Sequence, residues 1–229
     1  MEFAIRPARP GDARFLAWVA LASARSQLER GFWDLLIPEG EEARLDYLET
    51  LFRSEPPSWW HWSLFLIAER QGAPLAALSG FDPTDARFAK PDEAVIAALS
   101  VCGWSPARIQ EGLGRSAAFF SCVHQPEPGA WMVESVATRP EARGSGLAHA
   151  LLARILEDGR RGGFRSAQLS MLIGNAPAQR VYERFGFAIA AEKRSAEFEA
   201  ALGCPGIARM MCALHEGAQP SSSEASRRP

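Results

Sequence analysis

Residues 143–148, Arg-Gly-Ser-Gly-Leu-Ala, combine small residues with a positive charge in a pattern that suits phosphate binding. An apolar stretch precedes them and an amphipathic helix pattern follows. A helix N-terminus carries unpaired N–H groups and the positive end of the helix dipole, so it attracts anions. Gly144 and Gly146 would let the backbone approach a ligand without a clash from Cβ. The segment predicts either a phosphate site or an ordinary glycine-rich turn.

Two common nucleotide-binding motifs do not fit this segment. A Walker A loop requires a lysine, and none is present here. The dinucleotide-binding pattern GxGxxG has its third glycine where this chain has His149, and it normally begins a βαβ fold instead of lying past mid-chain. The pattern that remains is R-x-x-G-x-A, formed by Arg143, Gly146 and Ala148.

A second polar set follows in residues 174–187, GNAPAQRVYERFGF. Asn175 stands at the expected end of a strand, and its amide can both donate and accept hydrogen bonds. Tyr182 comes four residues after Ala178, on the same face of a helix. Taken alone, Asn175 is more often a helix cap and Tyr182 a core residue. Together with residues 143–148, their spacing favours one shared ligand-binding cleft.

An acidic residue, Glu134, lies in the strand pattern before the glycine-rich segment. It alternates with Met132 and Val136, so we expect these three residues to share one face of the strand. An acid between two apolar neighbours is unusual on a solvated face, and partial burial would raise its pKa. Glu134 is therefore either a general base or a solvated surface acid.

The elements that must position these residues follow from the apolar periodicity. Hairpin-connected strands come first, then one strand–helix–strand crossover over 131–172, then further antiparallel strands. This order predicts an α/β (α+β) domain with a mixed sheet and one parallel strand pair. Helix-like pieces at 91–101 and 106–123 predict a helical insertion over 83–129. We expect strands at 3–6, 62–69, 74–79, 131–138, 166–172, 187–192 and 208–214, and helices at 12–28, 41–52, 146–158, 176–184 and 196–202.

Composition narrows the class of protein. The 229 residues carry a net charge of -2, which gives no global attraction to nucleic acid or to an anionic membrane. The four cysteines lie far apart, so we expect no metal site and no disulfide framework. Neither a signal peptide nor an apolar run of spanning length is apparent, and we expect a cytoplasmic protein. Residues 1–215 are expected to form one domain, and the polar residues 216–229 a disordered tail.

The sequence V-A-T-R-P-E-A-R-G-S-G-L-A, followed by N-x-x-A-x-x-x-Y-x-x-x-G-F, resembles the GNAT superfamily of acyl-CoA-dependent N-acetyltransferases. The resemblance is strong over about 131–190, and AIRPARPGDA near the N-terminus resembles the first strand and helix start of the family. It implies a single GNAT-like domain whose parallel strand pair splays apart for CoA, with helices on both faces of the sheet.

The resemblance also implies roles for individual residues. The backbone of 143–148 would hold the CoA pyrophosphate, and Asn175 would bind the pantetheine arm. Tyr182 would act as the general acid, and Glu134 is the candidate base. The implied acetyl-CoA contacts are Val136, Ala137, Thr138, Arg143, Gly144, Ser145, Gly146, Leu147, Ala148, Asn175 and Tyr182, with no metal.

The acceptor side of the site is less defined. Phe32 and Trp33 are candidate substrate residues because, in the family, the first helices border the acceptor, although aromatic residues more often pack in a core. Four acids near them would suit a cationic amine, but acids are common at helix starts. These acids are Asp34, Glu39, Glu41 and Glu42.

The leading hypothesis is an enzyme that transfers an acetyl group from acetyl-CoA to the primary amine of a small molecule by direct attack. It would act as a monomer or homodimer, without nucleic-acid or membrane partners. The alternatives are a non-catalytic acyl-CoA-binding sensor and a protein or peptide N-acetyltransferase. A dinucleotide-dependent oxidoreductase is a distant fourth.

Overall fold

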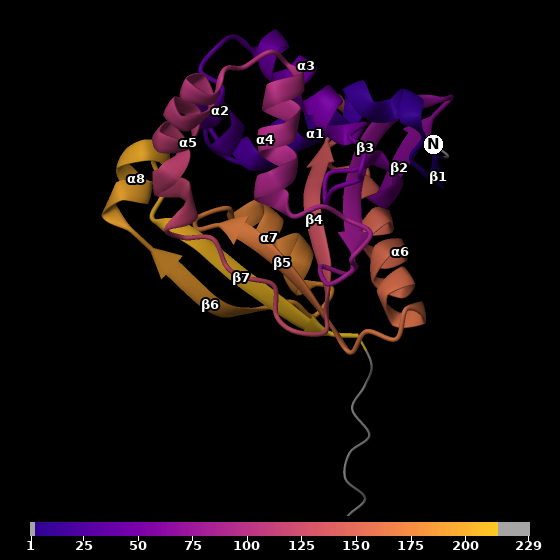
Figure 1. Ribbon diagram of the computed structural model, residues 1–229. Coiled ribbons are helices and arrows are strands. Elements are labelled where there is room, and N and C mark those ends of the chain that lie inside the picture. The colour runs from indigo at the N-terminus through magenta and orange to yellow at the C-terminus, as the bar shows by residue number, and fades with distance from the viewer. Residues whose placement is uncertain (1–2, 215–229) are drawn as a thin grey trace, which may run out of the picture.

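The computed structural model describes residues 3–214 and contains one seven-stranded sheet, ordered β1-β2-β3-β4-β5-β7-β6 (Figure 1). Only β4 and β5 pair in parallel; the other neighbouring strands are antiparallel. The mixed sheet expected from the sequence is therefore confirmed. The expected tail, 216–229, lies outside the described residues. The strands are β1 (Ala4–Pro7), β2 (Phe65–Arg70), β3 (Ala73–Phe81), β4 (Ala130–Thr138), β5 (Ser166–Leu172), β6 (Ala188–Arg194) and β7 (Gly206–Ala213).

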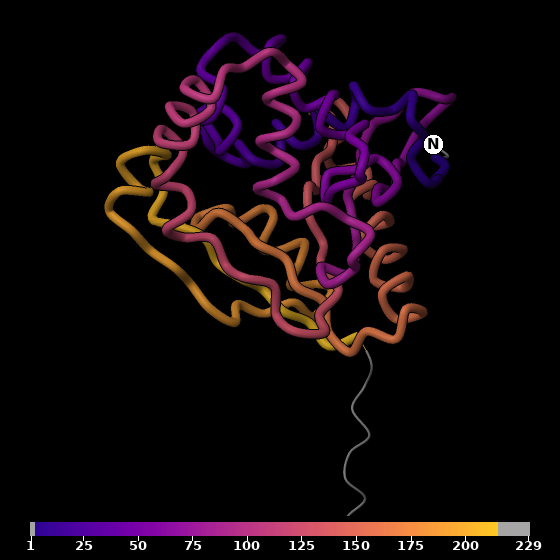
Figure 2. Tube along the Cα trace, in the orientation of Figure 1, coloured from indigo at the N-terminus to yellow at the C-terminus, as the bar shows by residue number. Residues whose placement is uncertain are grey.

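Helices cover both faces of the sheet, as Figure 2 shows along the chain trace. Helices α1–α5 lie on one face, called here the α1 face, and helices α6 and α7 lie on the other, the α6 face. The α-helices are α1 (Ala13–Arg25), α2 (Phe32–Leu36), α3 (Glu41–Phe52), α4 (Pro91–Val101), α5 (Pro106–Phe120), α6 (Leu147–Arg161), α7 (Ala176–Glu183) and α8 (Ala196–Leu202). Short 3-10 helices are η1 (Pro10–Asp12), η2 (Trp62–Leu64) and η3 (Pro140–Ala142).

The strand alternation divides the apolar core into two layers. On β3, Ala77 belongs to the core of the α1 face, while its neighbour Leu78 belongs to the core of the α6 face. Helix α6 packs its apolar side against that second layer through Leu151, Leu152 and Ile155. These three side chains are at most 3% exposed, so α6 is held rigidly where it begins beside the end of β4.

Strands β4 and β5 pair over a short length only. Their register runs from Ala130 opposite Ser166 to Met132 opposite Gln168 and then stops. Beyond this point β4 stays paired with β3 as far as Thr138, and β5 stays paired with β7 as far as Leu172. The two strands therefore separate, and a gap opens between their C-terminal halves.

A β-bulge in β4 lies at this gap. Ala77 pairs with Ala137 and Ser79 with Glu134, so one residue of β3, Leu78, lies opposite two residues of β4, Ser135 and Val136. The extra residue falls at Ser135, whose φ is +53°. Val136 consequently packs on the α6 face, as Val133 does. The expectation that Met132, Glu134 and Val136 share one face was wrong for Val136, because the bulge reverses the alternation after Glu134.

Residues 83–129 connect the adjacent strands β3 and β4 and contain α4 and α5. Both helices contribute apolar side chains to the core of the α1 face, including Ala98 from α4 and Ile109 from α5. Phe119, near the end of α5, also stacks on Phe198 of α8 with ring centroids 5.8 Å apart. The region thus joins the N-terminal helices to the connection between β6 and β7.

Local details differ from the sequence expectations near the N-terminus. Asp12 precedes α1, as expected for a cap, but its carboxylate accepts hydrogen bonds from the Arg6 guanidinium at 2.7 and 2.9 Å and from the Arg9 N–H at 2.7 Å. Residues 31–38 were expected only to break the helical pattern, yet they contain α2. A helix of 5 residues is too short to show a periodic apolar pattern.

Candidate acyl-CoA site

The glycine-rich segment forms the predicted turn into α6. Gly144 and Gly146 have φ values of +74° and +83°, in the left-handed region that glycine adopts without strain. A Cβ placed at either position would meet no atom within 4 Å. The space in front of both residues is therefore open, as a bound ligand would require.

Backbone N–H groups face this space without partners. Within residues 3–214, no hydrogen bond from the N–H groups of Gly144, Ser145 or Gly146 is found, and Leu147 and Ala148 occupy the first turn of α6, where N–H groups have no intrahelical acceptor. The N–H of Arg143 differs from the expectation, because it donates to Pro140 O at 3.3 Å. Its side chain is exposed and forms no ion pair in the described chain, so its contribution is charge.

The gap between β4 and β5 leaves a free main-chain edge next to this turn. Val136, Ala137 and Thr138 come after the point where β4 loses its pairing with β5. Main-chain groups on that edge of β4 have no strand partner in the described sheet, and unpaired edges readily pair with an extended ligand. The hydroxyl of Ser79 donates to Glu134 O at 3.2 Å and stabilises the bulged strand at the mouth of the gap.

Glu134 points to the α1 face of the sheet. Its neighbour Val133 packs on the α6 face, so the two residues project in opposite directions. The Glu134 carboxylate is partly buried and forms no hydrogen bond or ion pair with the described residues. Burial without a compensating partner raises the pKa of Glu134 to about 7, which places its titration where a general base works at neutral pH.

Tyr182 lies on the α6 face, where α7 packs on the sheet. It is 8% exposed, and its ring meets Phe187 edge-on at 6.2 Å between centroids. Ala178, one turn earlier, packs against the same apolar cluster, as the spacing predicted. The hydroxyl has no hydrogen-bond partner in residues 3–214, and burial raises the pKa of Tyr182 to about 12. The phenol therefore stays protonated at neutral pH and can donate a proton.

Asn175 caps α7 and connects it to the loop after α1. Its Oδ1 accepts a hydrogen bond from the Ala178 N–H at 3.1 Å, and its Nδ2 donates to Ser26 Oγ at 2.5 Å. The ordinary role as a helix cap is therefore present. An amide nitrogen has two N–H groups and an amide oxygen two lone pairs, so one donor and one acceptor position remain for a ligand.

The structure does not bring the candidate substrate residues Phe32 and Trp33 into an open cleft. Phe32 is 8% exposed and packs against Phe119 at 4.9 Å between ring centroids. Trp33 is 3% exposed and lies between Tyr47 and Trp60. Both belong to the apolar core of the α1 face, which is the alternative that the sequence left open.

The acids near these aromatic residues do not form a free negative rim, because each one pairs with arginine. Asp34 is the most buried of them: burial acts to raise its pKa, but hydrogen bonds from Arg25 and the Gly31 N–H, with the charge of Arg44, hold the pKa below its usual value. The pairs are Asp34 with Arg25 and Arg44, Glu39 with Arg108, Glu41 with Arg25, and Glu42 with Arg14.

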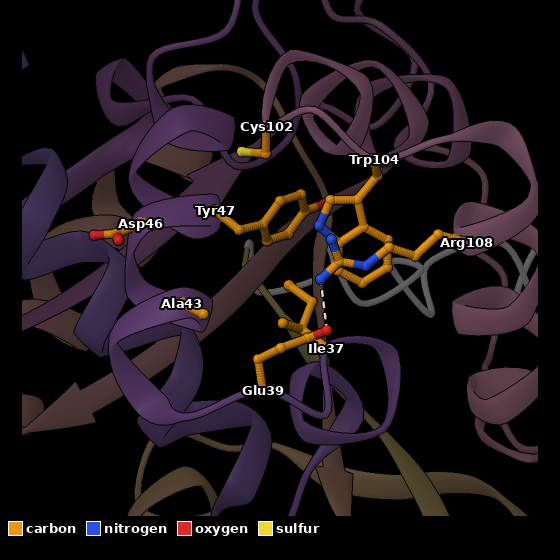
Figure 3. A pocket seen from close by; sticks show the side chains of 8 residues that line it. All are labelled: Ile37, Glu39, Ala43, Asp46, Tyr47, Cys102, Trp104 and Arg108. Atoms are coloured by element: carbon orange, nitrogen blue, oxygen red, sulfur yellow. Dashed lines mark hydrogen bonds and ion pairs between the residues drawn. The ribbon is translucent and has the colours of Figure 1, made fainter.

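A pocket of about 240 Å³ lies between α3 and the α4–α5 region (Figure 3). Figure 3 shows the Arg108 guanidinium against the Trp104 ring, where it lies 3.9 Å from the ring centroid, and its pairing with Glu39. Of the residues that line this pocket, Glu39 is one of the four acids considered for the acceptor side, and none is a predicted acyl-CoA or catalytic residue. The Arg108 guanidinium in this pocket already contacts the Trp104 ring and pairs with the Glu39 carboxylate. The pocket is therefore not part of the acyl-CoA site.

Several residues at the site could not be identified from their sequence context. Ser26 and Ser135 both have positive φ values, and no sequence pattern marked either position. Arg209 on β7 did give a signal, because it is a charge within the apolar run IARMM.

In the part of the chain that the structure describes, no group of three or more His, Cys, Asp or Glu residues could hold a metal ion. No described helix is both long enough and apolar enough to cross a membrane.

Part of the chain is similar to a known protein family. Residues 102–187 match the model of the acetyltransferase (GNAT) family. No curated protein sequence matches the chain. The family match covers α5, strands β4 and β5, α6 and α7, and therefore every residue of the proposed acyl-CoA site.

Solved structures share the fold at low sequence identity. One acetyltransferase superposes with a TM-score of 0.65 at 17% identity, covering 93% of this chain and 100% of that chain. An N-acetyltransferase from Staphylococcus aureus Mu50 gives a TM-score of 0.62 at 18% identity, covering 91% and 99%. YncA from Salmonella typhimurium, solved with its cofactor acetyl-CoA, gives 0.52 at 16% identity, covering 97% and 99%. The resemblance to the GNAT superfamily is confirmed by the family match and the shared fold.

Proposed function

We propose that this chain, which has the GNAT fold and matches the GNAT family over residues 102–187, transfers an acetyl group from acetyl-CoA to the primary amine of a small molecule. The observation that carries the proposal is the gap between β4 and β5. It has unpaired amides at its open end, a partly buried carboxylate on one face and a protonated phenol on the other.

The residues present fit acetyl-CoA, which supplies the acetyl group as an activated thioester. The open space at Gly144 and Gly146 would accommodate the pyrophosphate, with N–H groups of residues 144–148 as donors and the Arg143 guanidinium as a counter-charge. Main-chain groups of Val136, Ala137 and Thr138 would pair with the pantetheine arm, as would the remaining donor of Asn175.

Glu134 is proposed to remove a proton from the amine. A free alkylamine has a pKa of about 10.4 and is protonated at neutral pH, so it must lose a proton before it can attack. The Glu134 carboxyl, with its pKa near 7, is about half ionised at neutral pH and can accept that proton directly or through water. No partner cation in the described chain holds it in the charged form.

Tyr182 is proposed to protonate the leaving thiolate from the opposite face of the sheet. Glu134 belongs to the α1 face and Tyr182 to the α6 face, and the gap between β4 and β5 connects the two faces. This arrangement separates the base on the acceptor side from the acid on the leaving-group side. The buried phenol makes no hydrogen bond to residues 3–214, so its proton is free for transfer.

The experiment that tests the proposal combines binding with turnover. Calorimetric titration with acetyl-CoA, CoA, NAD and ATP identifies the ligand, and thiol release from acetyl-CoA with a panel of amines measures transfer. We expect binding of acetyl-CoA and CoA and amine-dependent thiol release. Acetyl-CoA binding without any turnover would favour a sensor, and turnover only with peptides would favour a protein acetyltransferase. Binding of NAD or ATP in place of CoA would contradict the proposal.

We further propose that the reaction takes place in the cytoplasm, with the protein as a monomer or homodimer. The four cysteines are free in the structure, which agrees with a reducing compartment.

A further inference from the structure

A row of three polar residues crosses the α1 face of the sheet at the gap between β4 and β5. Met132 lies beside Gln168 in the parallel register, so Glu134 and Ser170, each two residues further on, point to the same face. Ser170 is directly opposite Arg209 in the β5–β7 ladder, so Arg209 shares that face. The row therefore runs from Glu134 on β4 through Ser170 on β5 to Arg209 on β7.

This row lies between two covered parts of the β5–β7 surface. On one side, the buried Gln168 is covered by the segment after α5, because its amide binds Glu127 N–H at 2.7 Å and Gln125 O at 3.3 Å. On the other side, Leu172 and Ile207 are buried in the cluster around α8. Figure 1 shows the segment after α5 running across this part of the sheet. Ser170 between them is exposed, so the surface is open here.

The Arg209 guanidinium is only partly satisfied. Its Nη1 donates to Glu127 Oε2 at 2.8 Å. Its Nε is buried and has no hydrogen-bond partner, whereas Nη2 is not fully buried and makes no hydrogen bond to residues 3–214. A buried donor without an acceptor destabilises a structure, and a planar Nε–Nη2 edge matches the two oxygens of a carboxylate. The unpaired edge therefore points to an anionic ligand group.

We propose that Arg209 is a specificity residue that binds the carboxylate of the acceptor, and that the acceptor is accordingly an amino acid with a free carboxylate. This inference rests on the proposed function. The amine would lie at Glu134 and the carboxylate at the Nε–Nη2 edge of Arg209, with the Ser170 hydroxyl between them as a further hydrogen-bonding group. β5 and β7 are paired here, about 5 Å apart, and Glu134 lies across the gap between β4 and β5, so a small molecule that spans the row would enter this gap.

Glu127 has a positioning role in this arrangement. It binds Nη1 of Arg209, and its own N–H is fixed by Gln168, so the region between α5 and β4 orients the guanidinium. Because Nη1 is already paired, the opposite edge is the one left for substrate. The connection between α5 and β4 thus helps to set acceptor specificity through a residue on β7.

The test compares matched acceptors and matched variants. Thiol release is measured with L-amino acids, β-alanine and γ-aminobutyrate, each beside its carboxamide, which keeps the amine and removes the charge. Binding of the same compounds in the presence of CoA is measured by calorimetry, so that the result does not depend on turnover. The variants are Arg209→Gln, Arg209→Lys and, as a control on an exposed arginine that pairs with Asp85, Arg87→Gln.

We expect carboxylate acceptors to be preferred over their carboxamides. Arg209→Gln should raise KM for the carboxylate acceptor by about 10- to 100-fold, the range for hydrogen bonds to charged groups. It should leave the acetyl-CoA affinity and the KM for the carboxamide unchanged. Arg209→Lys should recover part of the loss, and Arg87→Gln should behave as wild type.

Two results would overturn the inference while the proposed function stands: equal use of carboxylates and carboxamides, or an Arg209→Gln protein with unchanged KM. Failure of every carboxylate compound to bind in the presence of CoA would also overturn it. Loss of acetyl-CoA binding by the wild-type protein, in contrast, would count against the proposed function itself.

Discussion

At the scale of single residues, burial gives two ordinary side chains distinct chemical roles. The Glu134 carboxyl is partly buried and the Tyr182 hydroxyl is buried, and neither has a hydrogen-bond partner in the described chain. In both cases burial raises the pKa. For the carboxyl the consequence is a base that titrates near neutral pH, and for the phenol an acid that remains protonated. Two predictions test these assignments.

Tyr182→Phe should lower the rate of thiol release by about 10²- to 10⁴-fold, the usual contribution of a general acid. The acetyl-CoA affinity and the stability should change little, because the lost hydroxyl has no hydrogen-bond partner in the described chain. Tyr47→Phe is the matched control, since Tyr47 is the other tyrosine and, within residues 3–214, its hydroxyl bonds only Val95 O, at 3.4 Å. Rates measured at saturating acetyl-CoA decide; an active Tyr182→Phe enzyme would refute the assignment.

Glu134 makes a pH-dependent prediction for rate and for stability. The rate should rise with pH through about 7 as the carboxylate forms, and Glu134→Gln should remove this step. A folded pKa raised above the ordinary 4.5 means that the folded state binds more protons between pH 4.5 and 7. Stability from this group is therefore present below pH 4.5 and is lost as pH rises through 7.

Urea unfolding of wild-type protein and Glu134→Gln checks the sign of this effect. As the pH rises from 5 to 8, the free energy of unfolding of the variant should increase by up to about 3 kcal/mol relative to that of the wild type. A constant difference between the two proteins across this range would show that the Glu134 pKa is not raised.

At the scale of elements, the turn into α6 can be tested apart from the fold. Gly146→Ala should lower the free energy of unfolding by about 1–2 kcal/mol, because alanine is strained in the left-handed backbone conformation. It should also weaken acetyl-CoA binding at least tenfold, because the methyl group enters the space proposed for phosphate. Gly203 has a φ of +84° and the same open surroundings, but lies at the end of α8. Gly203→Ala should therefore cost stability without loss of affinity, as measured by unfolding and calorimetry. Equal affinities for the two variants would contradict the phosphate site.

Most elements could be predicted from the sequence because their apolar periods are long. Strand 166–172 and helices 41–52 and 196–202 have the predicted bounds, and the crossover that contains α6 predicted the parallel pair. Local irregularities in the strands could not be predicted. The bulge at Ser135 depends on pairing with a distant strand, and it moved Val136 to the opposite face.

The candidate site could be predicted only in part for a similar reason. Residues 143–148 and Tyr182 lie in segments whose spacing is local, so the motif located them. The pairing of Asn175 with Ser26 and the row from Glu134 to Arg209 bring together residues far apart in the chain, and only the register of the strands shows them. The idea of a negatively charged rim near the acceptor was wrong, because arginines distant in sequence pair with these acids.

At the scale of the whole molecule, α8 joins the region between β3 and β4 to the sheet. Phe198 is 0% exposed and stacks on Phe119 of α5. Phe198→Ala should reduce the free energy of unfolding by about 3–5 kcal/mol through lost burial and the cavity left behind. Phe120→Ala, at a side chain that is 52% exposed, should cost much less. Denaturant unfolding compares the two, and a similar loss for both would show that α8 contributes little to the core.

The central claim is most directly tested by initial rates of thiol release from acetyl-CoA with purified wild-type protein in the presence and absence of amine acceptors at pH 8. Glu134 is ionised at this pH and Tyr182 is protonated. The account predicts CoA release that requires the amine, saturates with its concentration and yields the N-acetylated acceptor. Acetyl-CoA that binds but is never consumed with any amine, or that does not bind at all, would contradict it.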